Sequence, residues 1–322
     1  FPLLSIQNLE IAFRSETGTI TAVQNMSLEV NRGELVAIVG ESGSGKSITN
    51  LPLMGILGDN ALIKANACTF NNKNLLTLSQ SQWQNVRGKE IAMIFQDPMT
   101  ALNPFLTVEF QIVETILAHQ KCSKKEAVEK AIDLLSLVGI SSPSARLKSY
   151  PFELSGGMAQ RVMIAMAIST NPKLLIADEP TTALDVTIQK QILMLLKSLQ
   201  EKNNMSIILV THDLGVVSEF SDRVQVMYAG EIIESGFTDQ LITHPHHPYT
   251  AALLASRPGA IQRAAKSKLP SIAGIVPAFH QRPIGCQFHP RCPKAVEDCQ
   301  LVPIALKDNI RCLHPLREDR HE

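Results

Sequence analysis

The stretch GESGSGKS at residues 40–47 has the clearest potential for chemistry. It fits the pattern G-x4-G-K-[ST], in which glycines let successive backbone N–H groups curl round a phosphate and the following helix start favours negative charge. Lys46 is expected to reach the β- and γ-phosphates of a nucleotide, and the Ser47 hydroxyl to bind Mg²⁺. The stretch therefore predicts a nucleotide site. The residues expected to line it are Gly40, Ser42, Gly43, Ser44, Gly45, Lys46 and Ser47.

Two carboxylates follow an apolar run in LLIADE. A buried strand ending in Asp178 and Glu179 would deliver both to the strand's C-terminal edge, where ligands bind in parallel sheets. Asp178 would then belong to the Mg²⁺ site, and Glu179 would orient or deprotonate an attacking water. His212 ends the similar run ILVTHD and could contact a γ-phosphate, although a lone histidine is more often structural. For Gln96, which follows IAMIF, the choice between a functional and a structural role is equally open.

A second anion-binding helix start is predicted in LSGGMAQR. Ser155 can cap a helix in which Met158, Val162, Ala165 and Met166 recur at helical spacing. Two glycines at its beginning would expose N–H donors to an anion. Because the chain already has a phosphate loop, this start makes sense if it serves the nucleotide of a partner subunit.

Four cysteines are concentrated near the end of the sequence, in a stretch rich in proline and charge. They are Cys286, Cys292, Cys299 and Cys312. Thiolates on a loop-rich segment suit a metal that replaces a hydrophobic core. None of the spacings is as short as the C-x2–4-C of zinc knuckles, and wider loops can hold an iron–sulfur cluster, so spacing leaves both open. Cys68 and Cys122 stand alone and are expected to be unpaired thiols.

Positioning these groups requires an α/β core. Short apolar runs without alternation predict strands buried on both faces of a parallel sheet. These runs lie at 35–39, 91–95, 174–177 and 206–210. Between the second and third runs the period becomes helical, with Phe110, Val113 and Leu117 on one stripe. A capping box at 123–126 and Gly139 bound a second helix.

Composition excludes some classes of protein. The formal net charge is zero, which is unlike the basic field of a nucleic-acid binder. No run approaches the ~18 apolar residues needed to span a bilayer. The first residues lack the positive and apolar regions of a signal peptide, so we expect an internal location. After about Gly236 the composition shifts to proline and histidine, which predicts a loop-rich extension.

In this order the motifs resemble those of an ATP-binding cassette (ABC) subunit. GESGSGKS is similar to the Walker A loop, Gln96 to the Q-loop glutamine, LSGGM to the signature, LLIADE to Walker B, TALD at 182–185 to the D-loop, and His212 to the switch histidine. Phe13 lies where that family stacks an aromatic ring on adenine. The resemblance implies a P-loop NTPase (RecA-like) ABC domain at 1–236, with a helical subdomain inserted at about 97–172 and an extension at 237–322.

The resemblance also implies roles for individual residues. It implies ATP hydrolysis with catalytic roles for Glu179, His212 and Gln96, and Mg²⁺ held through Ser47, Gln96 and Asp178. Asp185 is the D-loop aspartate by the same comparison. The signature residues that would act on a partner's nucleotide are Ser155, Gly156, Gly157 and Gln160.

FQDPMTALNP, DEPTTALDVT, HPHHPYTAALL and the cysteine tail resemble ATPase subunits of bacterial peptide importers, with nickel importers as near relatives. This implies two membrane-spanning permease subunits, a second related or identical ATPase, a substrate-binding protein, and a peripheral position on the cytoplasmic face of the inner membrane. It also favours a [4Fe–4S] cluster over Zn²⁺ at the four cysteines. By the same resemblance His244, His246 and His247 are structural rather than metal ligands, and Asn72 accepts a left-handed turn in place of glycine. A cassette ATPase acting on nucleic acid or ribosomes is the alternative.

Overall fold

The computed structural model describes residues 1–16, 18–181, 184–256 and 272–316. Its central sheet has the strand order β11-β10-β3-β9-β8-β7, parallel except for the antiparallel β10–β11 pair. The strands are β3 (Leu35–Val39), β7 (Ile91–Ile94), β8 (Leu174–Asp178), β9 (Ser206–Thr211), β10 (Arg223–Tyr228) and β11 (Glu231–Phe237). Every residue of β3, β7, β8 and β9 is buried, so the four predicted strands are confirmed with their two-sided burial.

A second sheet, which the sequence reasoning did not predict, is antiparallel. It consists of β1 (Leu4–Ser15), β2 (Gly18–Val30), β4 (Ala61–Lys64), β5 (Ala67–Phe70) and β6 (Lys73–Asn74). Its apolar face shares one core with the central sheet, in which Leu4, Ile11 and Met26 meet Ile38. The turn between β5 and β6 contains Asn72 at φ 65°, the left-handed conformation expected there.

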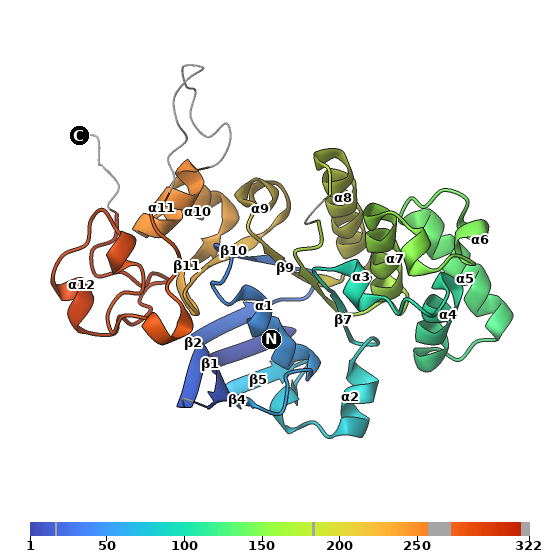
Figure 1. Cartoon of the computed structure of the whole chain (residues 1–322), viewed down its shortest axis with the longest axis horizontal. Helices are drawn as coiled ribbons and strands as arrows, with labels where there is room; N and C mark the ends of the chain where they lie inside the picture. The colour runs from blue at the N-terminus through green and yellow to red at the C-terminus, as the bar shows by residue number, and fades with distance from the viewer. Residues whose placement is uncertain (17, 182–183, 257–271, 317–322) are drawn as a thin grey trace, which may run out of the picture.

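Helices inserted between β7 and β8 form a separate lobe at one end of the molecule (Figure 1). They are α3 (Pro98–Ala101), α4 (Val108–His119), α5 (Lys124–Leu137), α6 (Pro143–Arg146) and α7 (Gly156–Ile168), with the short η3 (Pro151–Glu153). The Ser123–Glu126 capping box begins α5, and Gly139, at φ 76°, follows its C-terminal residues. We call this lobe the helical subdomain.

The predicted apolar stripe of α4 was wrong. Phe110 and Leu117 are 51% and 39% exposed, whereas the buried side chains include Val108, Ile112 and Ile116. Val113 is common to both sets. The buried stripe therefore runs through Val108, Ile112, Val113 and Ile116. An apolar residue on the other side of α4 remains at the surface because no element covers it within the described chain.

The remaining helices connect the strands or belong to the extension. They are α1 (Lys46–Asn50), η1 (Leu51–Met54), η2 (Leu75–Thr77), α2 (Gln80–Val86), α8 (Val186–Asn203), α9 (Leu214–Phe220), α10 (Thr238–Thr243), α11 (Pro248–Ala255), η4 (Phe279–Gln281), η5 (His289–Arg291) and α12 (Asp298–Leu301). The extension folds back on β10 and β11, where Tyr228, Tyr249 and Phe288 pack edge-to-face with centroids 4.7–5.3 Å apart. It lies at the opposite end from the helical subdomain (Figure 1).

Candidate active site

The phosphate-binding loop, residues 40–47, runs from the end of β3 into α1. Gly43 has φ 80° and Gly45, the residue before α1, has φ 101°. Side chains with a Cβ rarely adopt these angles, so both positions favour glycine. The strand–loop–helix context predicted for the motif is confirmed, and it directs the first N–H groups of α1 toward the loop.

Lys46 is held inside this loop. Its Nζ donates to the carbonyl oxygens of Gly40 at 2.9 Å and Glu41 at 3.1 Å, and lies 3.9 Å from Glu179 Oε1. Burial lowers the pKa of Lys46, while Glu179, Asp178 and Glu41 act in the opposite direction. A charged ammonium with carboxylates on one side and its own loop on the other is poised to receive a phosphate group.

Ser47 and Asp178 lie side by side, in the arrangement expected of two ligands of one Mg²⁺ ion. Ser47 Oγ donates to Asp178 Oδ1 at 3.0 Å. Neighbouring oxygens of an octahedral Mg²⁺ shell, each about 2.0–2.1 Å from the ion, are about 2.9 Å apart. Burial raises the pKa of Asp178, with the Ser47 hydrogen bond opposing it, and a bound cation would favour the ionised carboxylate. These two residues fit the ion.

The Glu179 side chain lies close to three other residues predicted to belong to the site. Its Oε2 accepts from Gln96 Nε2 at 3.3 Å and lies 3.4 Å from His212 Nδ1, while Oε1 faces Lys46. Its backbone has φ 46°, a left-handed conformation uncommon outside glycine and typical of functional sites. The structure therefore brings Gln96, Glu179 and His212 together beside the phosphate-binding loop. Gln96 contacts Glu179 here, so its role as a Mg²⁺ ligand stays a prediction.

The signature lies at the start of α7. Ser155 accepts from Met158 N at 3.3 Å and so caps the helix as expected. Ser155 and Gly156 are exposed, and nothing lies within 4 Å of where a Cβ of Gly156 would be. Gln160 differs from its neighbours because it is 3% exposed and its Nε2 donates to the Pro180 carbonyl at 2.6 Å. It thus links the signature helix to the residue after Glu179.

Two further predicted residues lie on β1 and at the start of α8. Phe13, on β1, pairs with Ile20 and Ala61 and is partly buried against the core shared by the two sheets. Asp185 caps α8 by accepting from Ile188 N at 3.0 Å. Residues 182–183 of the predicted D-loop lie outside the described residues. The adenine and D-loop roles stay predictions.

The residues 244–247, which we call the histidine segment, are anchored by a buried acid. Glu234, 2% exposed, accepts from His246 N at 2.7 Å and His247 N at 3.0 Å. His247 Nδ1 accepts from Tyr249 N at 3.0 Å, and burial lowers the pKa of His247 to about 4. These bonds agree with the structural role expected for the histidines.

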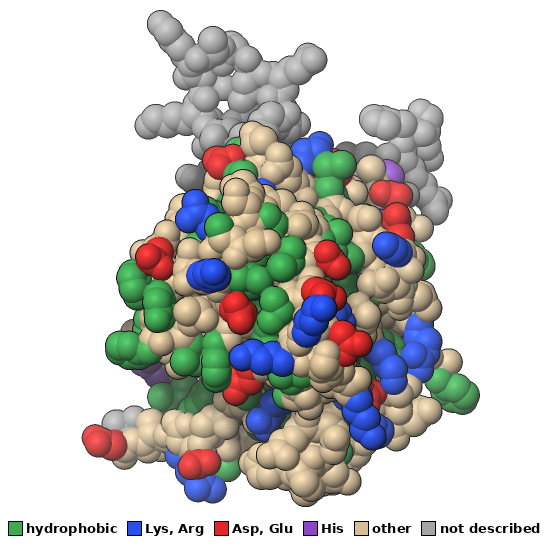
Figure 2. Space-filling model, turned by 90° about the vertical axis from the view of Figure 1, so that its right-hand side faces the viewer, with side chains coloured by type: hydrophobic (Ala, Val, Ile, Leu, Met, Phe, Trp, Pro, Cys, Tyr) green, Lys and Arg blue, Asp and Glu red, His purple; other side chains and the backbone are tan. Residues whose placement is uncertain are grey.

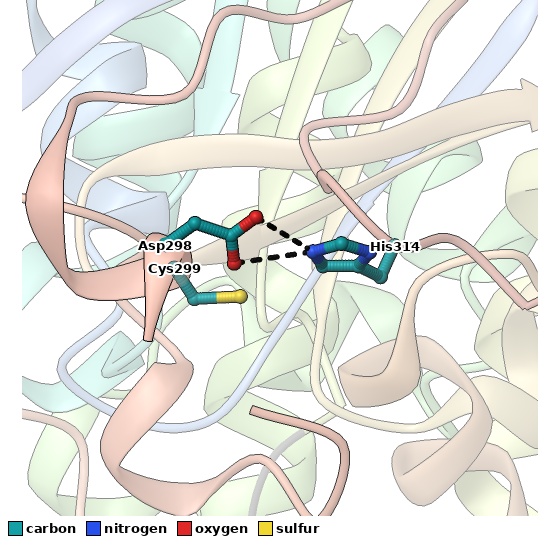
Figure 3. A group of neighbouring side chains, drawn as sticks. All are labelled: Asp298, Cys299 and His314. Atoms are coloured by element: carbon teal, nitrogen blue, oxygen red, sulfur yellow. Dashed lines mark hydrogen bonds and ion pairs between the residues drawn. The ribbon is translucent and has the colours of Figure 1, made fainter. Parts of the chain in front are cut away.

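The four clustered cysteines line one small cavity. Cys286 N donates to Cys299 O at 2.8 Å, which joins two of the loops that carry them. Burial, with a smaller contribution from the other three thiols, raises the pKa of the Cys286 thiol to about 11. Beside the cavity, Asp298 and His314 form an ion pair at 3.1 Å next to Cys299 (Figure 3). All six cysteines are free of disulfides, as predicted for Cys68 and Cys122.

Fold and site together define an ATP-binding cassette ATPase, and the comparisons agree. The family model "ABC transporter" matches residues 23–182, and the model "Oligopeptide/dipeptide transporter, C-terminal region" matches residues 233–299. The dipeptide transport ATP-binding protein DppD of Escherichia coli K12 is 48% identical over 98% of this chain and 97% of its own length. The chain therefore belongs to the ABC transporter ATPase family.

Other relatives support the same placement. The oligopeptide transport ATP-binding protein AppD of Bacillus subtilis is 50% identical over 92% of this chain and 90% of its own length. The solved dimeric structure of MJ0796, a bacterial ABC transporter cassette, is 28% identical with a TM-score of 0.66, covering 73% of this chain and 98% of that one. In the described part of the chain, every helix is too short or too polar to cross a membrane.

The sequence reasoning missed residues that support the site from outside it. Glu41 occupies a variable position of the loop motif, so the pattern assigned it no role. Tyr249 and Arg291, which contact it, lie more than two hundred residues away in the extension. No local pattern could have paired them.

Proposed function

We propose that this protein is the ATP-hydrolysing, energy-coupling subunit of an ABC importer of dipeptides or oligopeptides. One observation carries the proposal: Lys46, Ser47, Asp178 and Glu179 converge on a single site. The dipeptide and oligopeptide transport proteins among its relatives support the class of cargo. An importer of nickel or another small solute is the alternative with the same site.

Each residue of the site has a task in hydrolysis. Lys46 binds the β- and γ-phosphates, exchanging its bonds to Gly40 and Glu41 carbonyls for phosphate oxygens. Glu179 orients and deprotonates the attacking water, and Gln96 and His212 hold its carboxylate. Ser47 and Asp178 would hold Mg²⁺, which when bound neutralises phosphate charge.

The cycle needs a second ATPase, identical or related. The exposed Ser155 and Gly156 would close over the nucleotide of that partner, with Gly157 beside them. Gln160 would support the signature helix through its hydrogen bond to the Pro180 carbonyl. Asp185 would meet the partner at the same interface. Closure with ATP and reopening after hydrolysis form a two-state cycle biased by the γ-phosphate.

The helical subdomain supplies a surface for the two permease subunits. Phe105, Phe110 and Phe152 are 86%, 51% and 66% exposed. Figure 2 views the molecule from this end and shows hydrophobic side chains among charged ones. Exposed aromatic side chains are typical of binding surfaces. We therefore place the protein peripherally on the cytoplasmic face of the bacterial inner membrane, with the substrate-binding protein reached through the permease and no nucleic-acid partner.

Reconstitution tests this function. The complex purified with its permease subunits is expected to import short peptides, and peptide-loaded binding protein is expected to raise its ATPase rate. Import of nickel chelates with no response to di- or oligopeptides would contradict the cargo. Co-purification with ribosomal proteins or DNA instead of permease subunits would contradict the transporter.

We infer further that the four cysteines hold a [4Fe–4S] cluster, with Zn²⁺ as the alternative. Their convergence on one cavity supports a shared metal centre. Four sulfurs bound tetrahedrally to zinc at about 2.3 Å would be about 3.8 Å apart. Among the described residues, the three side chains whose ligand atoms all lie within 4.8 Å of one another are Asp298, Cys299 and His314, so no three of the four sulfurs are that close. The resemblance of this segment to the cysteine tails of peptide-importer ATPases favours the cluster over zinc.

A buried donor also fits such a group. His247 lines the cavity with a buried Nε2, and a backbone hydrogen bond with Arg311 raises the pKa of this ring against the larger effect of burial. Cluster sulfurs accept hydrogen bonds from the surrounding protein. Because Nδ1 already accepts from Tyr249 N, Nε2 carries the proton and can donate to sulfur.

Metal analysis of anaerobically purified protein tests the cluster. We expect brown protein with iron and acid-labile sulfide, and loss of both in Cys299→Ser. Cys122→Ser, at a partly buried thiol away from the cavity, should keep them. Colourless protein with one zinc per chain would contradict the cluster and leave the same ligands in place.

A further inference from the structure

The extension reaches the phosphate-binding loop at Glu41. Both oxygens of the Glu41 carboxylate are bound by Arg291, with Nη1 to Oε2 at 2.7 Å and Nη2 to Oε1 at 3.0 Å. A bidentate pair of this kind fixes orientation as well as distance. Glu41 is also the residue whose carbonyl accepts from Lys46 Nζ. The ion pair thus holds the loop one residue from its first glycine.

Arg291 is held in this position by several further acceptors. Its side chain is 6% exposed. Nε donates to Ala273 O at 2.7 Å, Nη2 also contacts the carbonyls of Ile272 and Gly274, and Nη1 contacts Tyr228 Oη at 3.3 Å. A guanidinium whose donors are all directed at fixed acceptors is a rigid clamp rather than a surface charge.

A second contact from the extension holds the same loop residue. Glu41 N donates to Tyr249 Oη at 2.9 Å, and the Tyr249 side chain is fully buried. Tyr249 N in turn donates to His247 Nδ1, and Glu234 anchors the histidine segment. The backbone and the side chain of Glu41 are therefore both held by the extension.

The clamp is continuous with the cysteine loops. Arg291 ends η5 and directly precedes Cys292. His289 N donates to Cys286 O at 3.0 Å, and Cys292 N donates to His289 O at 3.2 Å. The turn that presents Arg291 thus begins and ends at two of the clustered cysteines, so its conformation depends on how those cysteines are held.

We propose that Arg291 is a positioning residue for ATP binding: through Glu41 it holds the phosphate-binding loop in its binding shape, so that order in the turn from Cys286 to Cys292 sets the affinity for ATP. The proposal rests on the ATPase function proposed above. Because coupling between two sites is reciprocal, bound ATP stabilises the cysteine loops in turn. A purely structural role for the extension would leave ATP affinity unchanged.

Calorimetric titration of Mg-ATP into the purified full-length chain tests this. Arg291→Gln is expected to weaken ATP binding about tenfold, within the usual range of site-to-site coupling. The matched control is Arg311→Gln. Arg311 is also buried, with 7% of its side chain exposed, and directly precedes Cys312, but it fastens the extension to Ile232 O and Ile304 O instead of to the loop. The control should bind ATP as the wild type does, even where its melting temperature falls.

A double-mutant cycle makes the test specific to the ion pair. Glu41→Gln should weaken binding as Arg291→Gln does, and the double variant should be no worse than either alone. Arg291→Lys keeps the positive charge but lacks the paired N–H donors of the guanidinium. Its affinity for ATP should lie between those of the wild type and Arg291→Gln. Unchanged ATP affinity in folded Arg291→Gln, equal weakening in Arg311→Gln, or fully additive effects would each overturn the proposal. Absence of ATP binding by the wild type would instead contradict the proposed function.

Discussion

Exchanging Glu179 for glutamine isolates the chemical step. The change replaces one carboxylate oxygen by an NH₂ group, giving an amide, and keeps the side-chain volume. In the wild type the Glu179 carboxylate lies 3.3 Å from Gln96 Nε2 and 3.9 Å from Lys46 Nζ. The one oxygen that glutamine keeps can still accept from Gln96 or face Lys46. The pocket should therefore keep its shape while losing its base.

The expected magnitudes for turnover and for binding differ. Loss of a general base slows turnover about 10²–10⁴-fold, or about 3–5 kcal/mol of barrier. Binding is not weakened, because Lys46 keeps its phosphate contacts while the ATP phosphates lose a nearby repulsive charge, a term of up to about 4 kcal/mol at 4 Å and an effective dielectric of 20. Asp178 and Glu41 still support the ammonium. We therefore expect the variant to bind ATP at least as tightly as the wild type.

Steady-state ATPase measurements on the assembled complex, with ATP binding measured separately, check both expectations. Glu219→Gln is the matched control, because Glu219 is 52% exposed and pairs with Lys190 at the surface. It should hydrolyse ATP at the wild-type rate. A Glu179→Gln complex that keeps a tenth or more of wild-type turnover would refute the assignment of Glu179 as the base.

Three further changes have defined outcomes. Lys46→Ala should weaken ATP binding by at least tenfold in a titration, because a charge-assisted phosphate contact is lost; unchanged affinity would exclude Lys46 from the site. Glu234→Gln leaves one buried N–H of the histidine segment without an acceptor and should lower the free energy of unfolding by about 1–3 kcal/mol, measured in urea. Gly285→Ala would place a Cβ 2.2 Å from the Cys299 carbonyl and should cost about 1–3 kcal/mol, whereas Gly236→Ala, with open space around it, should not. Equal melting temperatures for the two alanine variants would contradict the packing at the cysteine loops.

The sequence by itself predicted the parts of the site that depend on neighbouring residues. The phosphate-binding loop, the four buried strands and the Ser155 and Ser123 caps follow from local conformational preference and short-range hydrogen bonds. Such features need no knowledge of what packs against them. Because parallel strands end at one edge, the meeting of Glu179 with the loop also followed.

The buried face of α4 and the long-range pairings were decided only by the tertiary structure. Phe110 and Val113 are both apolar residues of α4, yet Phe110 lies at the surface because no described element covers its side of the helix. The antiparallel sheet required pairing partners that alternation alone does not name. Arg291 and Glu41 are 250 residues apart, and their ion pair exists because the extension folds back on β10 and β11. The residues proposed to act in catalysis belong to local sequence motifs. The support of the phosphate-binding loop depends instead on contacts between distant segments, which only the tertiary structure specifies.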